Sequence, residues 1–243
     1  MTYCVALKLN QGLIFLADTR TNAGVDNISR VKKLFTWEVP DDRAIAMMTA
    51  GNLGITQAVI SELNEQLDRP KEGETNLYTA ASMFDIAQLV GDKMRDVQAR
   101  FGPGLAARGE DSGASIIVGG QRQGGRPRLF LIYAAGNFIE ATKDTPYFQI
   151  GEHKYGKPII DRVISVDTDL PDAIICALLS MDSTLRSNLS VGMPLDLAVI
   201  RTNELAFDQQ RRIEADDPAF REFSERWSQQ LRDAFSVMRT MKV

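Results

Sequence analysis

The sequence contains few of the residues that build metal and redox sites. Its 243 residues include two cysteines, Cys4 and Cys176, and one histidine, His153. Neither cysteine lies in a CxxC motif or a cysteine–histidine cluster, so we expect no zinc, no other metal and no cofactor. A single histidine also leaves one candidate base for a serine–histidine–aspartate triad. The two cysteines are expected to be buried thiols in a reducing compartment.

The sequence also lacks long apolar runs and a strong excess of one charge. No run approaches membrane-spanning length, so we expect no membrane partner. The net charge of -4 does not indicate a nucleic-acid partner. The first residues, MTYCVALKL, lack the basic leader and small-residue cleavage site of a signal peptide, which predicts a cytoplasmic protein. The length suits one large domain or two small ones, with a sizeable buried core.

Apolar runs broken by turn residues predict two hairpins at the start of the chain. Residues 2–9 and 13–17 flank Asn10-Gln11-Gly12, and residues 33–39 and 43–50 flank Pro40-Asp41-Asp42. Repeats of three and four residues predict helices at 52–67 and 83–101, the second ending before Gly102-Pro103-Gly104. Further strands are expected at 114–118, 129–134, 147–150 and 195–202, and further helices at 157–164 and 170–186. Because hairpins cluster, the order favours an α+β fold with antiparallel sheets over a parallel sheet.

The end of the chain has a different pattern. We treat residues 1–243 as one domain in which residues 203–243 form a C-terminal helical extension. Asp217-Pro218 supplies a cap and a first-turn proline. An apolar stripe at helical spacing then comprises Phe220, Phe223, Trp227, Leu231, Phe235 and Met238. The preferred interpretation is a helix docked on its own domain; the alternative is a contact between subunits, since aromatic residues are enriched at interfaces.

Four residues near the start suggest a nucleophile and its supporting groups. Thr2 becomes the first residue if Met1 is removed, which a small second residue permits. Asp18 comes directly after the second predicted strand, Lys33 begins the third, and Gly51 precedes the first helix. Taken singly, these residues have simpler interpretations. Thr2 could be an ordinary processed terminus, Asp18 and Lys33 a surface ion pair, and Gly51 a strand-to-helix turn.

Together these residues would solve a chemical problem. A threonine hydroxyl is a weak nucleophile and needs an adjacent base, and an N-terminal threonine carries its own α-amine, with a pKa of about 7.7–8.0. A nearby Lys33 would lower the pKa of that amine by charge repulsion, and Asp18 would keep the lysine charged and oriented. The amide of Gly51 could donate to a developing oxyanion. While Met1 remains attached, the Thr2 nitrogen lies in a peptide bond and cannot act as a base.

At this point the sequence resembles the proteasome β-subunits. The resemblance comes from Met-Thr at the start, Ala-Asp-Thr-Arg after the second strand, Lys-Lys-Leu-Phe at the third and Thr-Ala-Gly before the helix. It continues collinearly to about residue 202. The segments TNAGVDNIS, GEHKYGKPIIDR and LRSNLSVGMPLDLAVI resemble the bacterial group called Anbu, the ancestral β-subunits.

The resemblance implies a fold, an activity and an assembly. The fold would be the N-terminal-nucleophile hydrolase fold, a four-layer αββα sandwich of two antiparallel sheets. Thr2 would be nucleophile and base, Asp18 and Lys33 the supporting pair, and Gly51 the oxyanion donor, with Arg20 bracing a loop. The chain would form a homo-oligomeric ring or open lock-washer ring that acts on peptides or proteins, with no unfoldase partner identified. Maturation is expected to need removal of Met1 alone.

Two regions depart from the family pattern. There, an aspartate and a serine with the spacing of Ser187 and Ser190 help to position the terminal amine. This chain keeps Ser190 but has Ser187 in place of the aspartate, and Gly151-Glu152-His153-Lys154 replaces a glycine–serine segment near the amine. The resemblance thus implies a different hydrogen-bond network around the amine.

Three functions remain open from the sequence. The first is a self-assembling threonine peptidase, the second is an amidase for small amides on the same fold, and the third is an oligomeric scaffold with a weak or vestigial site. His153 is expected to be a surface-turn residue rather than an accessory group. Gly119–Gly125 predicts a flexible hairpin, because no phosphate-loop motif accompanies the glycines. Cys4 is expected to be a packed thiol rather than part of a substrate cleft.

Overall fold

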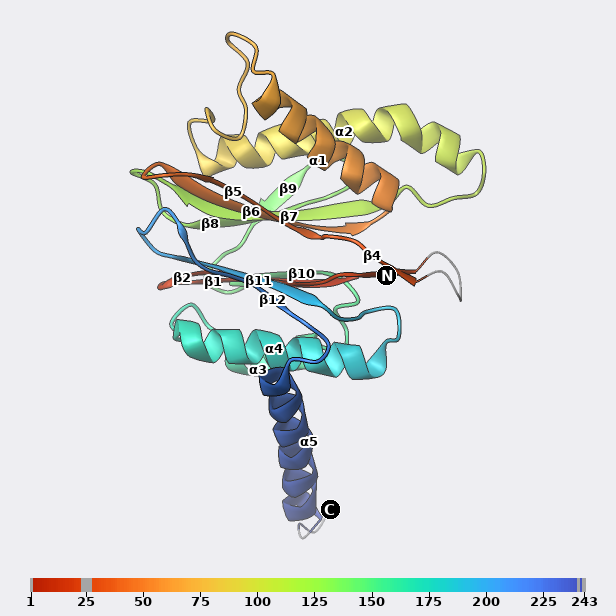
Figure 1. The fold of residues 1–243 in the computed structure, drawn as a ribbon, viewed down its shortest axis with the longest axis vertical. Helices are drawn as coiled ribbons and strands as arrows, with labels where there is room; N and C mark the ends of the chain where they lie inside the picture. The colour runs from red at the N-terminus through yellow and green to blue at the C-terminus, as the bar shows by residue number, and fades with distance from the viewer. Residues whose placement is uncertain (1, 23–27, 240, 242–243) are drawn as a thin grey trace.

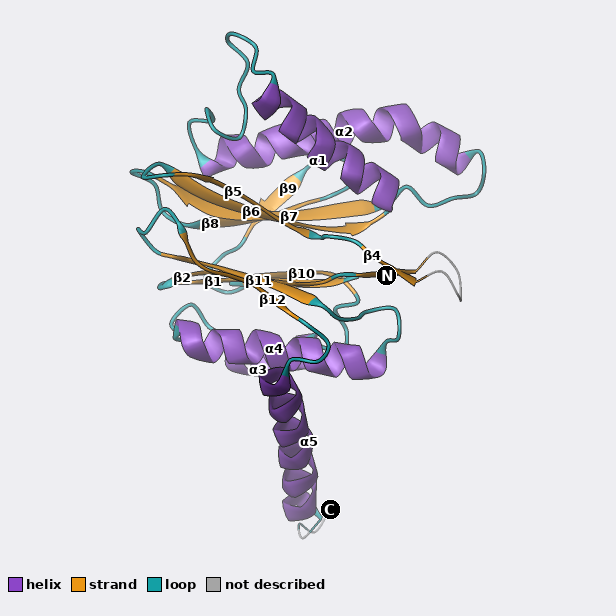
Figure 2. Cartoon of the chain, viewed as in Figure 1, coloured by secondary structure: helices purple, strands orange, loops and turns teal. Residues whose placement is uncertain are grey.

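Two antiparallel sheets lie face to face and carry helices on their outer surfaces (Figure 1). The structure is a computed structural model that describes residues 2–22, 28–239 and 241. Figure 2 shows strands in the two inner layers and helices outside them, with a last helix projecting from one side. The α+β fold with antiparallel sheets, and the four-layer αββα sandwich implied by the family resemblance, are confirmed.

The first sheet has the strand order β10-β1-β2-β11-β12. Its strands are β1 Tyr3–Leu9, β2 Gly12–Asp18, β10 Tyr147–Gly151, β11 Leu195–Arg201 and β12 Phe207–Ile213. A small pair, β3 Arg20–Asn22 and β4 Ile28–Arg30, follows β2; residues 23–27 between the two strands fall outside the described part of the chain. The first hairpin is confirmed by the pairing of β1 with β2.

The second sheet has the order β5-β6-β7-β8-β9. Its strands are β5 Leu34–Val39, β6 Arg43–Gly51, β7 Ala114–Arg122, β8 Arg128–Ile132 and β9 Phe138–Glu140. The pairing of β5 with β6 confirms the second hairpin. The predicted hairpin at Gly119–Gly125 is wrong for its first two glycines, which lie in β7. A Cβ on Gly120 would lie 2.2 Å from the Ala44 carbonyl oxygen, so glycine permits the close approach of β6 there.

The helices form the two outer layers. They are α1 Leu53–Asp68 and α2 Met83–Ala106 on the second sheet, and α3 Lys157–Val163 and α4 Leu170–Ser187 on the first. Asn52 caps α1, with its side chain accepting a hydrogen bond from the Ile55 amide. The expected end of α2 before Gly102 is wrong. The helix continues through Pro103 in its last turn because Leu105 packs against the core under α1 and α2.

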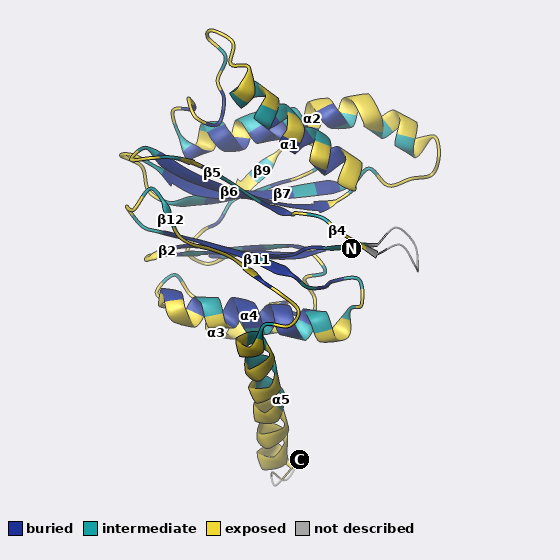
Figure 3. Cartoon of the chain, in the orientation of Figure 1, coloured by how far each residue is buried: buried dark blue, intermediate teal, exposed yellow. Residues whose placement is uncertain are grey.

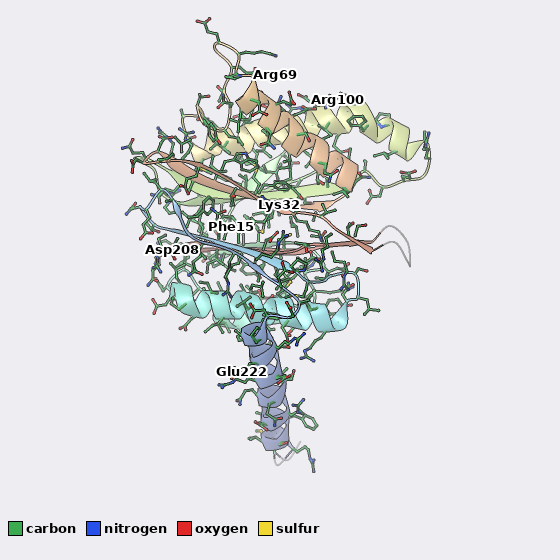
Figure 4. The ribbon with its side chains drawn as sticks, viewed as in Figure 1. Phe15, Lys32, Arg69, Arg100, Asp208 and Glu222 are labelled. Atoms are coloured by element: carbon green, nitrogen blue, oxygen red, sulfur yellow. The ribbon has the colours of Figure 1, made fainter. Side chains whose placement is uncertain are left out.

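Alternation along each strand divides the core into three parts. In β1, Tyr3, Val5 and Leu7 pack toward α3 and α4, while Cys4 and Ala6 face the second sheet. Phe15 of β2 lies fully buried between the two sheets (Figure 4). Burial on both faces explains why the strand sequences are nearly continuous apolar runs, and Figure 3 shows the buried residues concentrated in the inner layers.

The last helix, α5 Pro218–Met238, projects away from the body (Figure 1). The first turns of α5 dock on the domain, as the preferred interpretation predicted: Phe220 and Phe223 pack against the core of the first sheet. Beyond them the docking prediction is wrong, because Leu231 and Phe235 are 51% and 65% exposed. The segment predicted as a helical extension, residues 203–243, also contributes the edge strand β12 before this helix begins.

Candidate active site

Three of the predicted site residues line one cavity of about 330 Å³. Thr2 precedes β1, Lys33 directly precedes β5, and Gly51 ends β6. The lining residues are Thr2, Thr21, Val31, Lys33, Thr49, Ala50, Gly51, Leu53, Thr56, Gly151 and Glu152. The cavity thus lies where one end of the first sheet meets the corresponding end of the second, and residues from both sheets contribute to it.

Asp18 and Lys33 form a buried ion pair beside this cavity. Lys33 Nζ lies 2.6 Å from Asp18 Oδ1, and it also donates to the Arg20 carbonyl oxygen at 2.6 Å. Asp18 is fully buried at the end of β2 and Lys33 is 4% exposed. The alternative interpretation of Asp18 and Lys33 as a surface ion pair is therefore wrong, because both side chains are removed from water.

Backbone amides complete the environment of the carboxylate. Oδ1 accepts from the Tyr3 amide at 3.0 Å, and Oδ2 accepts from the amides of Arg20 and Gly192 at 3.2 and 3.1 Å. Burial raises the pKa of Asp18, while the Lys33 ammonium and the amides of Tyr3 and Gly192 act in the opposite direction. The bonds hold the carboxylate in one place, so the Lys33 ammonium is held at the cavity wall.

Thr2 is held in place by Gly151 and Glu152, which are distant from it in the sequence. The Glu152 amide donates to the Thr2 carbonyl oxygen at 2.7 Å. Gly151 has a positive φ of 81°, and a Cβ there would lie 1.9 Å from the same oxygen. Glycine at this position therefore lets the end of β10 contact the backbone of Thr2 directly. In the sequence, Gly151 was noted only as part of the segment 151–154 that differs from the family pattern. Nothing in the neighbouring residues indicated its positive φ or its contact with Thr2.

Gly51 is required by its backbone. Its φ is 101°, and a Cβ would lie 2.2 Å from the Gly113 carbonyl oxygen, so a side chain would push apart β6 and the start of β7. Gly51 contributes to the cavity lining together with Thr2. Its role as an oxyanion donor stays a prediction.

Arg20 connects the ion pair to the loop after α4. Its Nη1 donates to the Leu189 carbonyl oxygen at 2.8 Å, and a Cβ on Gly192 would lie 2.2 Å from its Nε. The guanidinium therefore lies directly on the Gly192 backbone, whose amide binds Asp18. The family resemblance implied that Arg20 braces a loop; the contact with residues 189 and 192 supports that role, which stays a prediction.

Ser190 lies in the same loop but outside the set of residues that line the cavity. Its amide donates to the Asn188 side chain at 2.9 Å, and Ser187 is exposed at the end of α4. The predicted role of Ser190 at the terminal amine stays a prediction.

The other candidates lie as the simpler interpretations expected. Cys4 is fully buried between the sheets, does not line the cavity, and has a pKa raised by burial. His153 lies in an exposed turn with Nδ1 3.2 Å from the Gly151 carbonyl oxygen. Within the described residues, no cluster of three or more histidine, cysteine, aspartate or glutamate side chains could hold a metal ion. No helix in that part of the chain is long and apolar enough to cross a membrane.

Comparison with known proteins now assigns the family. The proteasome subunit model matches residues 2–200, so the chain belongs to the proteasome family and has the fold of a proteasome-like N-terminal-nucleophile hydrolase. Within that family it belongs to the Anbu group, the ancestral β-subunits. Comparison with curated proteins found no match.

Three solved structures support this assignment. The Anbu Gly-1 mutant from Hyphomicrobium sp. strain MC1 is 50% identical, with 100% of this chain and 99% of that chain covered and a TM-score of 0.92. Anbu from Yersinia bercovieri is 48% identical, with 99% of each chain covered and a TM-score of 0.92. The helical assembly of the Anbu complex from Pseudomonas aeruginosa is 45% identical, with 99% and 98% covered and a TM-score of 0.92.

Proposed function

We propose that this chain is an N-terminal threonine hydrolase that cleaves peptide bonds through Thr2. The observation that carries the proposal is that Thr2 and Lys33 line one cavity while Lys33 is held by the fully buried Asp18. A buried cation at a cavity wall beside a threonine supports this function, because it can favour the neutral form of an adjacent amine base and stabilise an ionising hydroxyl.

The proposed reaction begins once the Thr2 α-amine is free. The neutral amine takes the hydroxyl proton as Oγ1 attacks the substrate carbonyl carbon, and the carbonyl oxygen becomes an oxyanion. The Gly51 amide donates to that oxygen. The protonated amine then gives its proton to the leaving nitrogen as the peptide C–N bond breaks. Water, deprotonated by the same amine, hydrolyses the resulting ester and restores the hydroxyl.

Lys33 acts on both partners of the first proton transfer. Its ammonium repels a proton on the nearby amine and so lowers the pKa of that amine. The same charge stabilises negative charge that develops on the threonine oxygen. Asp18 positions the ammonium and does not exchange protons with substrate.

Intact-mass spectrometry with a β-lactone probe tests this proposal. We expect the processed protein to lack Met1 and to gain one probe mass on Thr2. Thr2→Ala should gain none and should lose hydrolysis, while Thr2→Ser, which keeps a hydroxyl, should still react. Equal turnover by Thr2→Ala would refute the nucleophile assignment.

A second candidate, an amidase for small amides, is favoured by the size of the cavity. A volume of about 330 Å³ lies near the lower limit of small-molecule sites, so a short acyl group could fill it. Fluorophore release from peptides compared with small acyl amides separates the two activities. Absence of both activities, together with absence of probe labelling, would favour the scaffold function.

We further propose that the chain assembles with copies of itself. The Anbu complex from Pseudomonas aeruginosa is described as a helical assembly, and α5 here exposes apolar side chains with no cover in the described chain. The proposed assembly is the ring or open lock-washer ring that the family resemblance implies. A helix is the form described for the Pseudomonas aeruginosa complex. Both cysteines are free and buried, which supports a reducing compartment such as the cytoplasm.

A further inference from the structure

Two charged residues line the candidate active-site cavity, Lys33 and Glu152. They differ in how their charges are balanced. The Lys33 ammonium lies 2.6 Å from the buried Asp18 carboxylate, so its charge acts on groups next to it, such as Thr2, and is largely offset for a group farther along the cavity. Glu152 therefore supplies the negative charge that an incoming group would meet.

The backbone of Glu152 is fixed against the nucleophile. Its amide donates to the Thr2 carbonyl oxygen at 2.7 Å, and the neighbouring Gly151 is in direct contact with Thr2. The next turn is closed by the His153 amide, which donates to the Gly151 carbonyl oxygen at 3.0 Å. The Cα atom of Glu152 is thus held in a fixed position relative to Thr2.

The charge of Glu152 is balanced weakly within the chain. Its side chain is 18% exposed, and Lys154 Nζ lies 3.7 Å from Glu152 Oε2. The Lys154 side chain is 67% exposed, so this pair is screened by water and a competing cation can replace it. Glu152 is therefore available to a positive group that enters the cavity.

The rest of the cavity suits the stem of a basic side chain. Val31, Ala50 and Leu53 contribute apolar surface, and Thr21 and Thr49 contribute neutral hydroxyl-bearing side chains. Lysine and arginine bury methylene groups against apolar walls while their charged ends meet polar groups. An acidic substrate side chain would instead meet the charge of Glu152.

We propose that Glu152 makes this site selective for substrates with a lysine or arginine side chain beside the scissile bond. The proposal rests on the proposed function, because it names the substrate class of the same cavity. Glu152 is a specificity-determining residue here, and the chemical steps remain those of Thr2.

A matched peptide series tests the proposal. Acetyl-Ala-Ala-X-aminomethylcoumarin with X as lysine, norleucine or glutamate varies charge at nearly constant length. We expect kcat/KM for lysine to exceed that for norleucine by about fivefold, the ratio that a partly exposed ion pair supplies. Glu152→Gln should bring this ratio close to one and should improve turnover of the glutamate peptide.

Two variants control this result. Lys154→Gln removes the competing cation and should widen the preference for lysine. Glu204→Gln changes an exposed turn residue outside the cavity lining and should leave the ratio unchanged. An equal loss on all three peptides in Glu152→Gln would overturn the proposal, because that result would mean that Glu152 acts on the nucleophile and not on the substrate.

Binding separates this proposal from the proposed function. Fluorescence anisotropy with Thr2→Ala protein measures the affinities of fluorescein-labelled Ala-Ala-Lys and Ala-Ala-norleucine peptides without hydrolysis. Preferential binding of the lysine peptide that disappears in Thr2→Ala/Glu152→Gln supports the selectivity, even if the wild-type protein hydrolyses nothing and the proposed function fails. Equal binding of both peptides contradicts the selectivity, even if hydrolysis by Thr2 is established.

Discussion

At the scale of single residues, the pair formed by Asp18 and Lys33 connects stability with chemistry. Both side chains are almost completely removed from water, and each is held by backbone groups as well as by the other. Breaking such a pair by removing one partner leaves a charge buried without compensation. The same substitution would also remove the ammonium proposed to tune the Thr2 amine, so the two effects have to be measured separately.

Lys33→Ala should therefore reduce both activity and stability. We expect kcat/KM to fall by about 10²-fold or more, the range for loss of proton-transfer support. The free energy of unfolding should fall by about 3–5 kcal/mol because Asp18 loses its partner. Kinetics below the melting transition and thermal unfolding followed by circular dichroism measure the two effects. A large loss of stability with only mild loss of activity would make Lys33 a structural residue.

The pH dependence at low pH should separate activity from folding. Burial raises the pKa of Asp18, so its carboxylate takes up a proton at a higher pH than an ordinary aspartate does. As pH falls through that pKa, the pair with Lys33 is lost and activity should decrease. A carboxyl group with a raised folded pKa binds its proton more tightly in the folded state, so this step should not unfold the protein.

Measurement of kcat/KM against pH, together with near-ultraviolet circular dichroism, checks this prediction. We expect the activity to decline before the near-ultraviolet signal does. Coincident loss of both would attribute the acid limb to unfolding. Protonation of the Thr2 amine also lowers activity as the pH falls. In Asp18→Asn the carboxyl group is absent, so only the contribution of the amine would remain.

At the scale of elements, the end of β10 determines where Thr2 lies. Gly151 closes the strand with a positive φ and contacts the Thr2 backbone, and β1 pairs with β10 at Tyr3 and Gly151. Thr2, the proposed nucleophile, is thus positioned by a neighbouring strand that is distant in the sequence.

Gly151→Ala should displace Thr2. A Cβ would lie 1.9 Å from the Thr2 carbonyl oxygen, so one of the two backbones has to move. We expect kcat/KM to fall by about 10²-fold from the displaced nucleophile, and stability to fall by about 1–3 kcal/mol. Gly73→Ala is the matched control, because Gly73 also has a positive φ but a Cβ there meets nothing within 4 Å. Similar kinetic losses in both variants would contradict the contact argument.

At the scale of the whole molecule, α5 is the element that its own domain covers least. The Ser224 hydroxyl of α5 donates to Asp182 of α4 and accepts from Arg186 of α4 at 2.7 Å, which ties the first turns of α5 to the body. Further along, Leu231, Phe235 and Met238 are more than half exposed. An apolar helical stripe in water is a surface for association, and aromatic residues there favour contact between subunits.

Deletion of residues from Asp217 onward should therefore weaken self-assembly. We expect a smaller mean mass by light scattering at equal protein concentration, with the far-ultraviolet spectrum reduced only by the lost helix. A full-length variant with Leu231, Phe235 and Met238 changed to serine should behave similarly, while Arg232→Gln should assemble as wild type. An unchanged mass after deletion would limit α5 to contacts within its own chain.

Much of this molecule follows from the sequence alone. Apolar runs bounded by turn residues specified the hairpins of β1–β2 and β5–β6, since a strand buried on both faces has to be apolar throughout. Helical repeats located α1, α2 and α4, and the motifs around Thr2, Asp18 and Lys33 indicated the proteasome family. Local patterns are sufficient here because they depend on neighbouring residues and on burial.

Only the tertiary structure decided how the site is built and where the last helix points. The contact of Gly151 with Thr2, the depth of the Asp18–Lys33 pair and the place of Glu152 in the cavity lining join segments far apart in the chain. The repeat in α5 marked an apolar face but did not say which surface covers it. A sequence pattern defines which faces are apolar or charged, whereas the packing of one sheet on the other determines which faces meet.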